Sequence, residues 1–165
     1  MIRIGITGHV HLTTGSTKPI YDAILTVLRE YGDGCVRGVT CLADGADQIF
    51  ARAVLATSGS YEVILPAFDY RDKQIRPEAQ PDFDELVRNA TTVSYTGHAR
   101  SGDDAYLDAS LEMLRRCDRL LAVWDGRAGG RSGGTADVVT RARTMRLPVT
   151  VIWPDGAART GAATI

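Results

Sequence analysis

The sequence lacks the features of several large protein classes. Its cysteines, Cys35, Cys41 and Cys117, form no C-x-x-C pair, which excludes a disulfide framework and a cysteine-based zinc site. No apolar run approaches the roughly 18 to 20 residues of a membrane span, and the first residues lack the long apolar stretch of a secretory signal. We therefore expect a cytoplasmic protein without membrane contact, metal or cofactor.

The sequence also lacks an excess of charge of either sign. Nineteen Lys and Arg residues face twenty Asp and Glu residues, for a formal net charge of -1. A near-neutral chain has no general basic surface for DNA, so we expect no stable nucleic-acid binding. The Gly-Lys-Ser or Gly-Lys-Thr end of a Walker A loop is absent as well. Any anion site is therefore local and of another kind.

What is present is an ordinary globular composition, with 44% hydrophobic residues in 165, enough for one buried core. Short apolar runs predict strands at 2–6, 36–42, 61–65, 92–95, 119–124 and 149–153. Apolar residues at three-and-four spacing predict helices at 19–31, 47–57, 83–90, 105–117 and 135–145. Alternation of strands and helices favours parallel pairing, because parallel neighbours need crossovers. We predict a Rossmann-like α/β three-layer sandwich with a mainly parallel sheet, forming a single nucleotide-binding domain over 1–154 and a frayed tail over 155–165.

The strongest local signal is the glycine-rich stretch 125–134, which follows a predicted strand and precedes a predicted helix. Glycines let the backbone approach a ligand, and the amides at a helix start attract phosphate. We expect the amides of Gly133, Gly134 and Thr135 to hold a phosphate, with Arg131 adding charge. The alternative is a flexible surface loop with no ligand.

Other irregular segments follow predicted strands, and such loops line one crevice in open α/β sheets. Thr7, Gly8 and His9 come after the first strand, although a single histidine is often structural. Asp44 and Gly45 come after the second strand; Asp44 either contacts a ligand or caps the next helix.

The long stretch 66–81 carries Phe68, Tyr70, Arg71, Lys73 and Arg76. It either folds over a nucleotide, with an aromatic ring on the base, or forms a solvated insertion.

Four segments together resemble the SLOG superfamily, which unites the DprA/SMF proteins, the LOG phosphoribohydrolases and a set of nucleotide-ligand sensors. They are 7–9, 42–47, 117–126 and 133–137. The resemblance spans the chain from Ile2 to about Trp153. It implies a Rossmann-like domain, often a homodimer, that binds a nucleotide or nucleotide-derived ligand over the glycine-rich loop.

The resemblance also implies a possible activity. LOG enzymes carry Pro-Gly-Gly-x-Gly-Thr-x-x-Glu, whose Glu assists cleavage between ribose and base. Here Trp124-Asp125-Gly126 replaces the first part of that motif, and Asp137 stands two residues after Thr135 without a Glu after it. We therefore favour a nucleotide sensor or carrier. The alternative is an N-glycosidic hydrolase of nucleoside 5′-monophosphates that uses Asp137 or Asp125 as its catalytic carboxylate.

Overall fold

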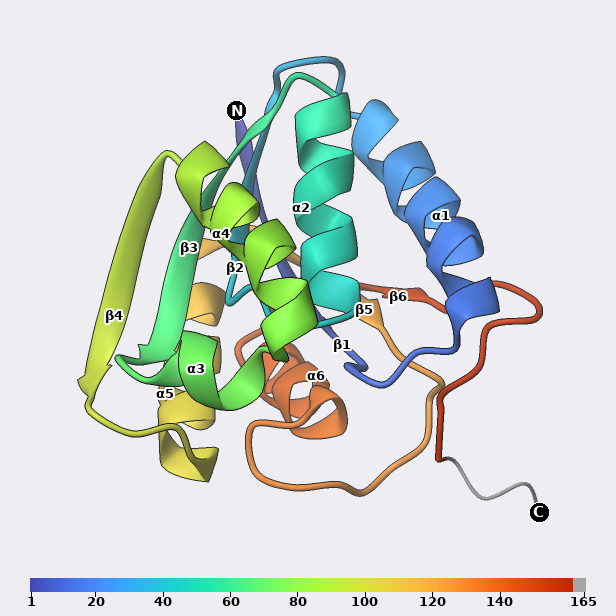
Figure 1. The fold of residues 1–165 in the computed structure, drawn as a ribbon. Coiled ribbons are helices and arrows are strands. Elements are labelled where there is room, and N and C mark those ends of the chain that lie inside the picture. Colours follow the sequence, from blue (N-terminus) through green and yellow to red (C-terminus); the bar gives the residue numbers. More distant parts are fainter. Residues whose placement is uncertain (162–165) are drawn as a thin grey trace.

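The structure, a computed structural model, describes residues 1–161 (Figure 1). The strands are β1 (Ile2–Gly8), β2 (Val36–Thr40), β3 (Ser60–Ala67), β4 (Thr92–His98), β5 (Arg119–Val123) and β6 (Val149–Ile152). The helices are α1 (Thr17–Arg29), α2 (Ala46–Ala56), α3 (Tyr70–Gln74), α4 (Gln80–Asn89), α5 (Asp103–Arg116) and α6 (Thr135–Thr144), with 3-10 turns at Thr14–Ser16 and Pro77–Ala79. All the predicted strands and helices are present.

The sheet has the strand order β4-β3-β2-β1-β5-β6, and every neighbouring pair is parallel. The chain first builds outward from β1 to β4, then crosses back to place β5 on the other side of β1. Helices α1, α2 and α4 cover one face of the sheet, and α5 and α6 cover the other (Figure 1). This confirms the predicted Rossmann-like α/β fold, and it puts the point where the crossovers diverge between β1 and β5.

Burial explains why the helices pack where they do. On α1, Ile20, Ile24 and Leu28 recur every fourth residue and are completely buried against the sheet. Each such side chain contributes about 1.5 to 3 kcal/mol on leaving water. On the other face, Met113 of α5 and Val138 of α6 belong to a separate, smaller core cluster. The two clusters fix the helices on either side of the strand ends.

The structure departs from the sequence predictions at three element boundaries. Segment 66–81 was expected to be irregular, yet it holds α3 and the start of α4. A five-residue helix is too short for its periodicity to be recognised. Strand β4 continues to His98, beyond the predicted end at Tyr95, whereas β2 stops at Thr40 because Leu42 adopts a left-handed φ of 53°.

The first part of the predicted tail is hydrogen-bonded to the segment after β1. The amide of Thr13 donates to the carbonyl of Ala158 over 3.0 Å, and the amide of Thr160 donates to the carbonyl of His11 over 2.7 Å. The Ser16 hydroxyl accepts the Ala158 amide at 2.8 Å. These bonds join residues far apart in sequence, so local composition does not reveal them. Residues 162–165, the rest of the predicted tail, lie outside the described residues.

Within residues 1–161, no helix has both the length and the apolar character needed to cross a bilayer.

Candidate functional site

A cleft of about 1270 Å³ opens beyond the carboxyl ends of the central strands. Its walls come from the segments that follow β1, β2, β3 and β5, from α5, and from the segment after β6. Ligand sites of open α/β sheets lie at this point, where neighbouring crossovers leave for opposite faces. The cleft contains all nine residues predicted to bind a ligand: Thr7, Gly8, His9, Asp44, Gly45, Arg131, Gly133, Gly134 and Thr135.

The glycine-rich loop is closed on itself next to α6. The Gly133 amide donates to the Asp137 carboxylate over 2.8 Å, and the Gly134 amide donates to the Arg131 carbonyl over 2.9 Å. Two of the three amides predicted to hold phosphate therefore already have partners. Within the described part of the chain, the amides of Thr135 and Ala136 donate no hydrogen bond. Both residues line the cleft. Of the three predicted amides, that of Thr135 remains free at this helix start, and the amide of Ala136 is a further free donor that was not predicted.

Gly133 has a structural reason to be glycine. Its φ is 77°, and a Cβ placed there would lie 3.0 Å from the backbone nitrogen of Leu107 on α5. The loop therefore approaches α5 through a position that tolerates no side chain. Gly126, Gly129 and Gly130 also have positive φ, but a Cβ at each of them would meet no atom within 4 Å.

The two predicted catalytic carboxylates do not face the cleft. Among residues 1–161, the acidic residues that line it are Asp44 and Asp47. Asp137 accepts both the Gly133 amide and the Arg141 guanidinium, 3.0 Å away, and these hydrogen bonds hold its pKa below the usual value. A carboxylate so occupied is a poor proton donor or nucleophile. The geometry gives Asp137 the role of closing the loop.

Asp125 lies in a network at the back of the glycine-rich loop. The His9 Nε2 accepts the Asp125 amide over 3.2 Å, and the Asp125 carboxylate accepts the Arg127 amide over 3.1 Å. Arg159 forms an ion pair with that carboxylate at 3.0 Å. Burial opposes ionisation of Asp125, but the Arg127 amide and the neighbouring His9 and Arg159 outweigh it and lower the pKa.

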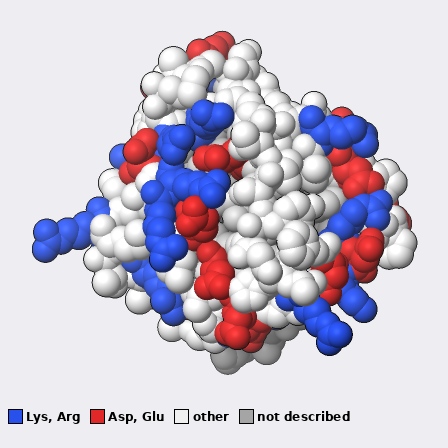
Figure 2. Space-filling view, turned by 90° about the vertical axis from the view of Figure 1, so that its left-hand side faces the viewer, with Lys and Arg blue, Asp and Glu red and all other residues white. Residues whose placement is uncertain are grey.

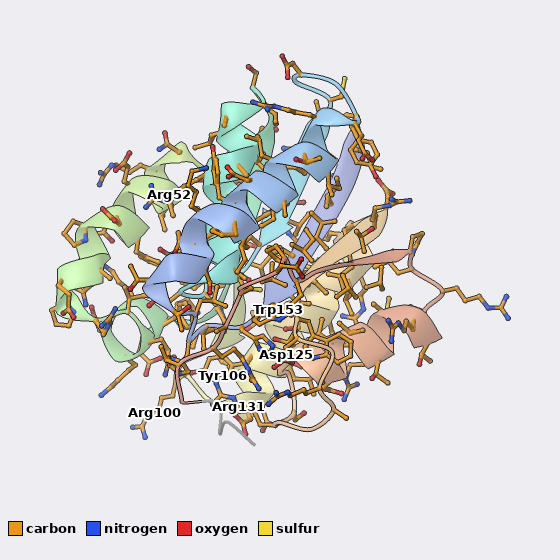
Figure 3. All side chains as sticks on the ribbon, turned by 90° about the vertical axis from the view of Figure 1, so that its right-hand side faces the viewer. Arg52, Arg100, Tyr106, Asp125, Arg131 and Trp153 are labelled. Atoms are coloured by element: carbon orange, nitrogen blue, oxygen red, sulfur yellow. The ribbon has the colours of Figure 1, made fainter. Side chains whose placement is uncertain are left out.

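The surroundings of His9 disfavour its charged form. Burial and the positive charge of Arg159 lower its pKa and outweigh the attraction of Asp125. The Nε2 of His9 lies 3.2 Å from the Asp125 amide nitrogen and also 3.2 Å from the Asp125 carboxylate. Trp153 contacts the imidazole in a T-shaped arrangement with ring centroids 5.6 Å apart, and Figure 3 shows Trp153 beside Asp125. His9 therefore joins the segment after β1 to the segment after β5.

The segment after β2 is organised by a carboxylate that the sequence analysis did not select. Asp47 is buried and accepts the Thr40 hydroxyl and the amides of Cys41 and Ala43 at 3.2 to 3.3 Å. Burial outweighs these three bonds and raises the pKa of Asp47 to about 7. The position of Asp47 in the sequence could have indicated this role. An acidic residue in the first turn of a helix can accept hydrogen bonds from the loop that connects the preceding strand to the helix.

Asp44 and Gly45 complete this segment. The Asp44 carboxylate accepts the Gly45 amide over 2.9 Å, and α2 begins at Ala46 without a side-chain cap. Gly45 has φ 85°, and a Cβ there would lie 2.7 Å from the carbonyl oxygen of His9. Gly45 therefore allows the segments after β1 and β2 to touch.

The charge around the cleft differs from that of the whole chain. Six cationic residues line it: Lys18, Arg52, Arg76, Arg127, Arg131 and Arg159. Among residues 1–161, two carboxylates, Asp44 and Asp47, line it as well. Arg131 lies over the Tyr106 ring, 5.2 Å from its centroid, and 3.6 Å from Asp103, and Figure 3 shows Arg131 and Tyr106 together at the cleft. The cleft lining thus carries more cations than carboxylates, although each of these cations also has a carboxylate within 4.0 Å.

Sequence reasoning missed Arg52 and Arg159. Arg52 lies on α2 two turns after Asp44, on the opposite side of the cleft from Arg131 (Figure 3). Arg159 lies in the segment predicted to fray. Arg100 points away from the cleft (Figure 3) and is exposed.

Tyr70 and Arg76 are among the residues of segment 66–81 that line the cleft. Phe68 is 65% exposed and packs on Tyr95 of β4, with ring centroids 5.0 Å apart, and it does not line the cleft. Arg71 pairs with Asp84 of α4 through two hydrogen bonds of 2.6 and 2.7 Å. Arg76 is the cation of this segment that reaches the cleft.

Comparison with solved structures relates this fold to known proteins. DNA processing protein A (DprA) from Streptococcus pneumoniae matches with a TM-score of 0.70 at 16% identity, over 94% of this chain and 52% of that one. The Helicobacter pylori protein of that name, described with a single-stranded DNA binding mode, matches with a TM-score of 0.67 at 14% identity, over 96% and 68%. The molybdenum cofactor binding protein of Rippkaea orientalis matches with a TM-score of 0.58 at 17% identity, over 93% and 77%.

This chain therefore spans about half the length of the S. pneumoniae protein. No family model matches the sequence. No curated protein matches it either.

Proposed function

From the SLOG fold of this chain, we propose that the cleft binds a nucleotide or a nucleotide-derived phosphorylated metabolite, as a sensor or carrier. The observation that carries the proposal is the charge of the cleft, where six cationic residues face two carboxylates although the whole chain has a net charge of -1. A concave site lined by one sign of charge concentrates ligands of the opposite sign. The volume of about 1270 Å³ suffices for a ligand larger than free phosphate.

The phosphate belongs at the start of α6. The free amides of Thr135 and Ala136 and the positive end of the helix dipole attract an anion there. The Thr135 hydroxyl adds a donor and Arg131 adds a charge. Gly133 and Gly134 contribute the shape of the loop, because their own amides already donate within it.

The sugar and base belong toward the segment after β2. The carboxylate of Asp44 is partly exposed at the cleft wall and accepts hydrogen bonds from hydroxyls, as ribose offers them. Thr7, Gly8 and His9 form the wall between the two ends. Gly8 also serves packing, because a Cβ there would lie 2.4 Å from the Cβ of Ala46.

Binding without turnover fits this site better than hydrolysis. Cleavage of an N-glycosidic bond needs a carboxylate placed at the reacting carbon. Asp125 and Asp137 are both committed to amides and arginines and lie outside the cleft lining. We therefore retain the sensor or carrier role for this chain.

Thermal-shift measurements with defined probes test the proposal. Nucleoside 5′-monophosphates, sugar phosphates and inorganic phosphate are compared with the same nucleosides lacking phosphate. A ligand at about 100 times its Kd stabilises the folded state by about 2.7 kcal/mol, which raises the melting temperature by roughly 5 °C or more. We expect at least one phosphorylated probe, and no unphosphorylated nucleoside, to produce such a shift.

Matched variants locate the bound phosphate. Thr135→Ala and Arg131→Ala should reduce the shift, whereas Thr144→Ala, at the other end of α6, and Arg100→Ala, outside the cleft, should leave it unchanged. The proposal fails if no phosphorylated probe stabilises the wild type, or if nucleosides stabilise it as much as their monophosphates do. A salt-sensitive gel shift with single-stranded DNA, without any response to small phosphates, would instead favour a nucleic-acid ligand.

A further inference from the structure

The outer edge of β4 is an open sheet edge. β4 ends the strand order, so one row of its backbone groups has no strand partner among residues 1–161. Edge strands usually carry lysines, prolines or other charges that prevent pairing with another chain. The stretch Thr92–His98 contains no Lys, Arg, Asp, Glu or Pro. This edge therefore lacks the usual protection.

Apolar side chains stand beside this edge. Val93 and Tyr95, two residues apart, point to the same face of the sheet and are 38% and 48% exposed. Phe68, which packs on Tyr95, is 65% exposed. Together they add exposed apolar surface along the open backbone row.

The opposite edge of the sheet is built differently. Strand β6 has only four residues, Val149–Ile152, against seven in β4. A short edge strand offers few backbone groups for pairing. The asymmetry points to β4 as the edge that takes a partner.

Charges on α5 run beside the β4 edge in a self-complementary order. Asp108 bonds to His98 of β4, and the Arg116 guanidinium lies 3.5 Å from the Ser94 hydroxyl, so this side of the helix faces the edge strand. Asp103, Asp104 and Asp108 occupy the first half of α5, while Arg115 and Arg116 end it and both pair with Glu112 of the same helix. Figure 2 shows the edge as an uncharged band between two rows of charged side chains, the left-hand row acidic at its lower end and mixed above.

We propose that β4 pairs antiparallel with β4 of a second copy of this chain, so that the two sheets join into one. A two-fold axis that passes between the middles of the two β4 strands gives this arrangement. In such an interface, residue i of one copy contacts residue j of the other, and residue j of the first contacts residue i of the second. The axis sets α5 antiparallel to α5 of the other copy. The acidic start of each helix then faces the basic end of the other.

The same arrangement leaves the clefts accessible. The cleft lies at the divergence between β1 and β5, whereas the proposed interface follows β4, three strands away from β1 in the sheet order. Ligand binding and dimer formation are therefore separable by mutation.

Light scattering coupled to size-exclusion chromatography tests the interface on the full chain. The wild type should elute with twice the monomer mass of 17.8 kDa and dissociate on dilution. The double variant Val93→Lys with Tyr95→Lys places four like charges across the two-fold axis and should raise the dimer Kd at least about tenfold. Because both side chains are already exposed, its unfolding midpoint should match that of the wild type. Val151→Lys, at an exposed position of the opposite edge strand, is the matched control and should remain dimeric.

Charge reversal tests the orientation. Arg115→Glu and Asp104→Arg should each weaken the dimer, and the double variant should recover part of the loss, because the exchanged charges again face each other. A wild type that is monomeric at every accessible concentration overturns the proposal. A dimer that tolerates the two lysines on β4 overturns it as well, since the interface must then lie elsewhere. A double charge variant weaker than both single variants excludes the antiparallel α5 arrangement.

Discussion

The carboxylate of Asp137, in the first turn of α6, accepts the amide of Gly133, the residue two positions before the helix begins, at 2.8 Å. This backward bond resembles the half of a capping box in which the third helical residue secures the chain before the helix. It also fixes the direction of the glycine-rich loop relative to the free amides of Thr135 and Ala136.

Removal of this bond should destabilise the fold. Asp137→Ala should lower the free energy of unfolding by about 1 kcal/mol, because the Gly133 amide loses its acceptor. Asp137→Asn keeps an acceptor oxygen and should lose less. Chemical denaturation of the two variants measures the difference. Equal losses in both would show that the charge facing Arg141, and not the bond to Gly133, supplies the stabilisation.

The same substitution separates binding from hydrolysis. We expect no release of free base from nucleoside 5′-monophosphates by the wild type, because Asp137 and Asp125 are held away from the cleft. Chromatography of the incubated nucleotides measures base release. Turnover by the wild type that disappears in Asp137→Asn would assign the catalytic role to Asp137 and contradict our proposal.

The sequence predicted the fold more completely than the site. Alternating strands and helices have a periodicity that can be recognised locally, and the crossover rule then determines parallel pairing. The same rule places the segments after β1, β2 and β5 at one end of the sheet, which is why all nine predicted ligand-binding residues line one cleft. Local sequence patterns do not show which hydrogen-bond or ion-pair partner each polar group has.

Partners of polar groups depend on long-range packing. The Gly133 amide was predicted to be free because its acceptor lies on the following helix. Arg159 was not predicted because its segment is held by bonds to residues 11–16, which are far away in the sequence. Asp47 was not among the predicted site residues. Its bonds to Cys41 and Ala43 depend on the left-handed backbone conformation of Leu42. The sequence does not predict that conformation, because apolar residues rarely adopt it.

A pair of glycine substitutions measures the contact between the segments after β1 and β2. Gly45→Ala and Gly126→Ala both force a side chain into positive φ, at a cost of about 1 to 3 kcal/mol each. Only the Cβ at Gly45 also collides with backbone, 2.7 Å from the His9 carbonyl oxygen. Gly45→Ala should therefore lose clearly more unfolding free energy than Gly126→Ala. Similar losses would mean that the His9 segment moves aside without cost.

Asp47 should make stability depend on pH. Its pKa is raised from 3.8 to about 7, so the folded state holds the proton more tightly than the unfolded chain. This contribution is complete below about pH 4 and is lost as the pH rises through 7, for a total of about 4 kcal/mol. Asp47→Asn cannot ionise and should lack this loss. Unfolding free energies of both proteins at about pH 5 and about pH 8 give the comparison. Curves that stay parallel between these values would show that Asp47 is already ionised at pH 5.

His9 should titrate below its ordinary pKa of 6.5, because burial and Arg159 disfavour the charged ring more than Asp125 favours it. A lowered pKa means that the unfolded chain takes up the proton first, so this contribution to stability is present above pH 6.5 and is lost as the pH falls. NMR of the imidazole protons measures the midpoint. Arg159→Gln removes the repelling charge and should raise the midpoint, while Arg76→Gln, which pairs with Asp44 and Glu78, should leave it unchanged. If the titration midpoint of His9 is the same in Arg159→Gln as in the wild type, Asp125 already neutralises Arg159 and burial alone lowers the pKa of His9.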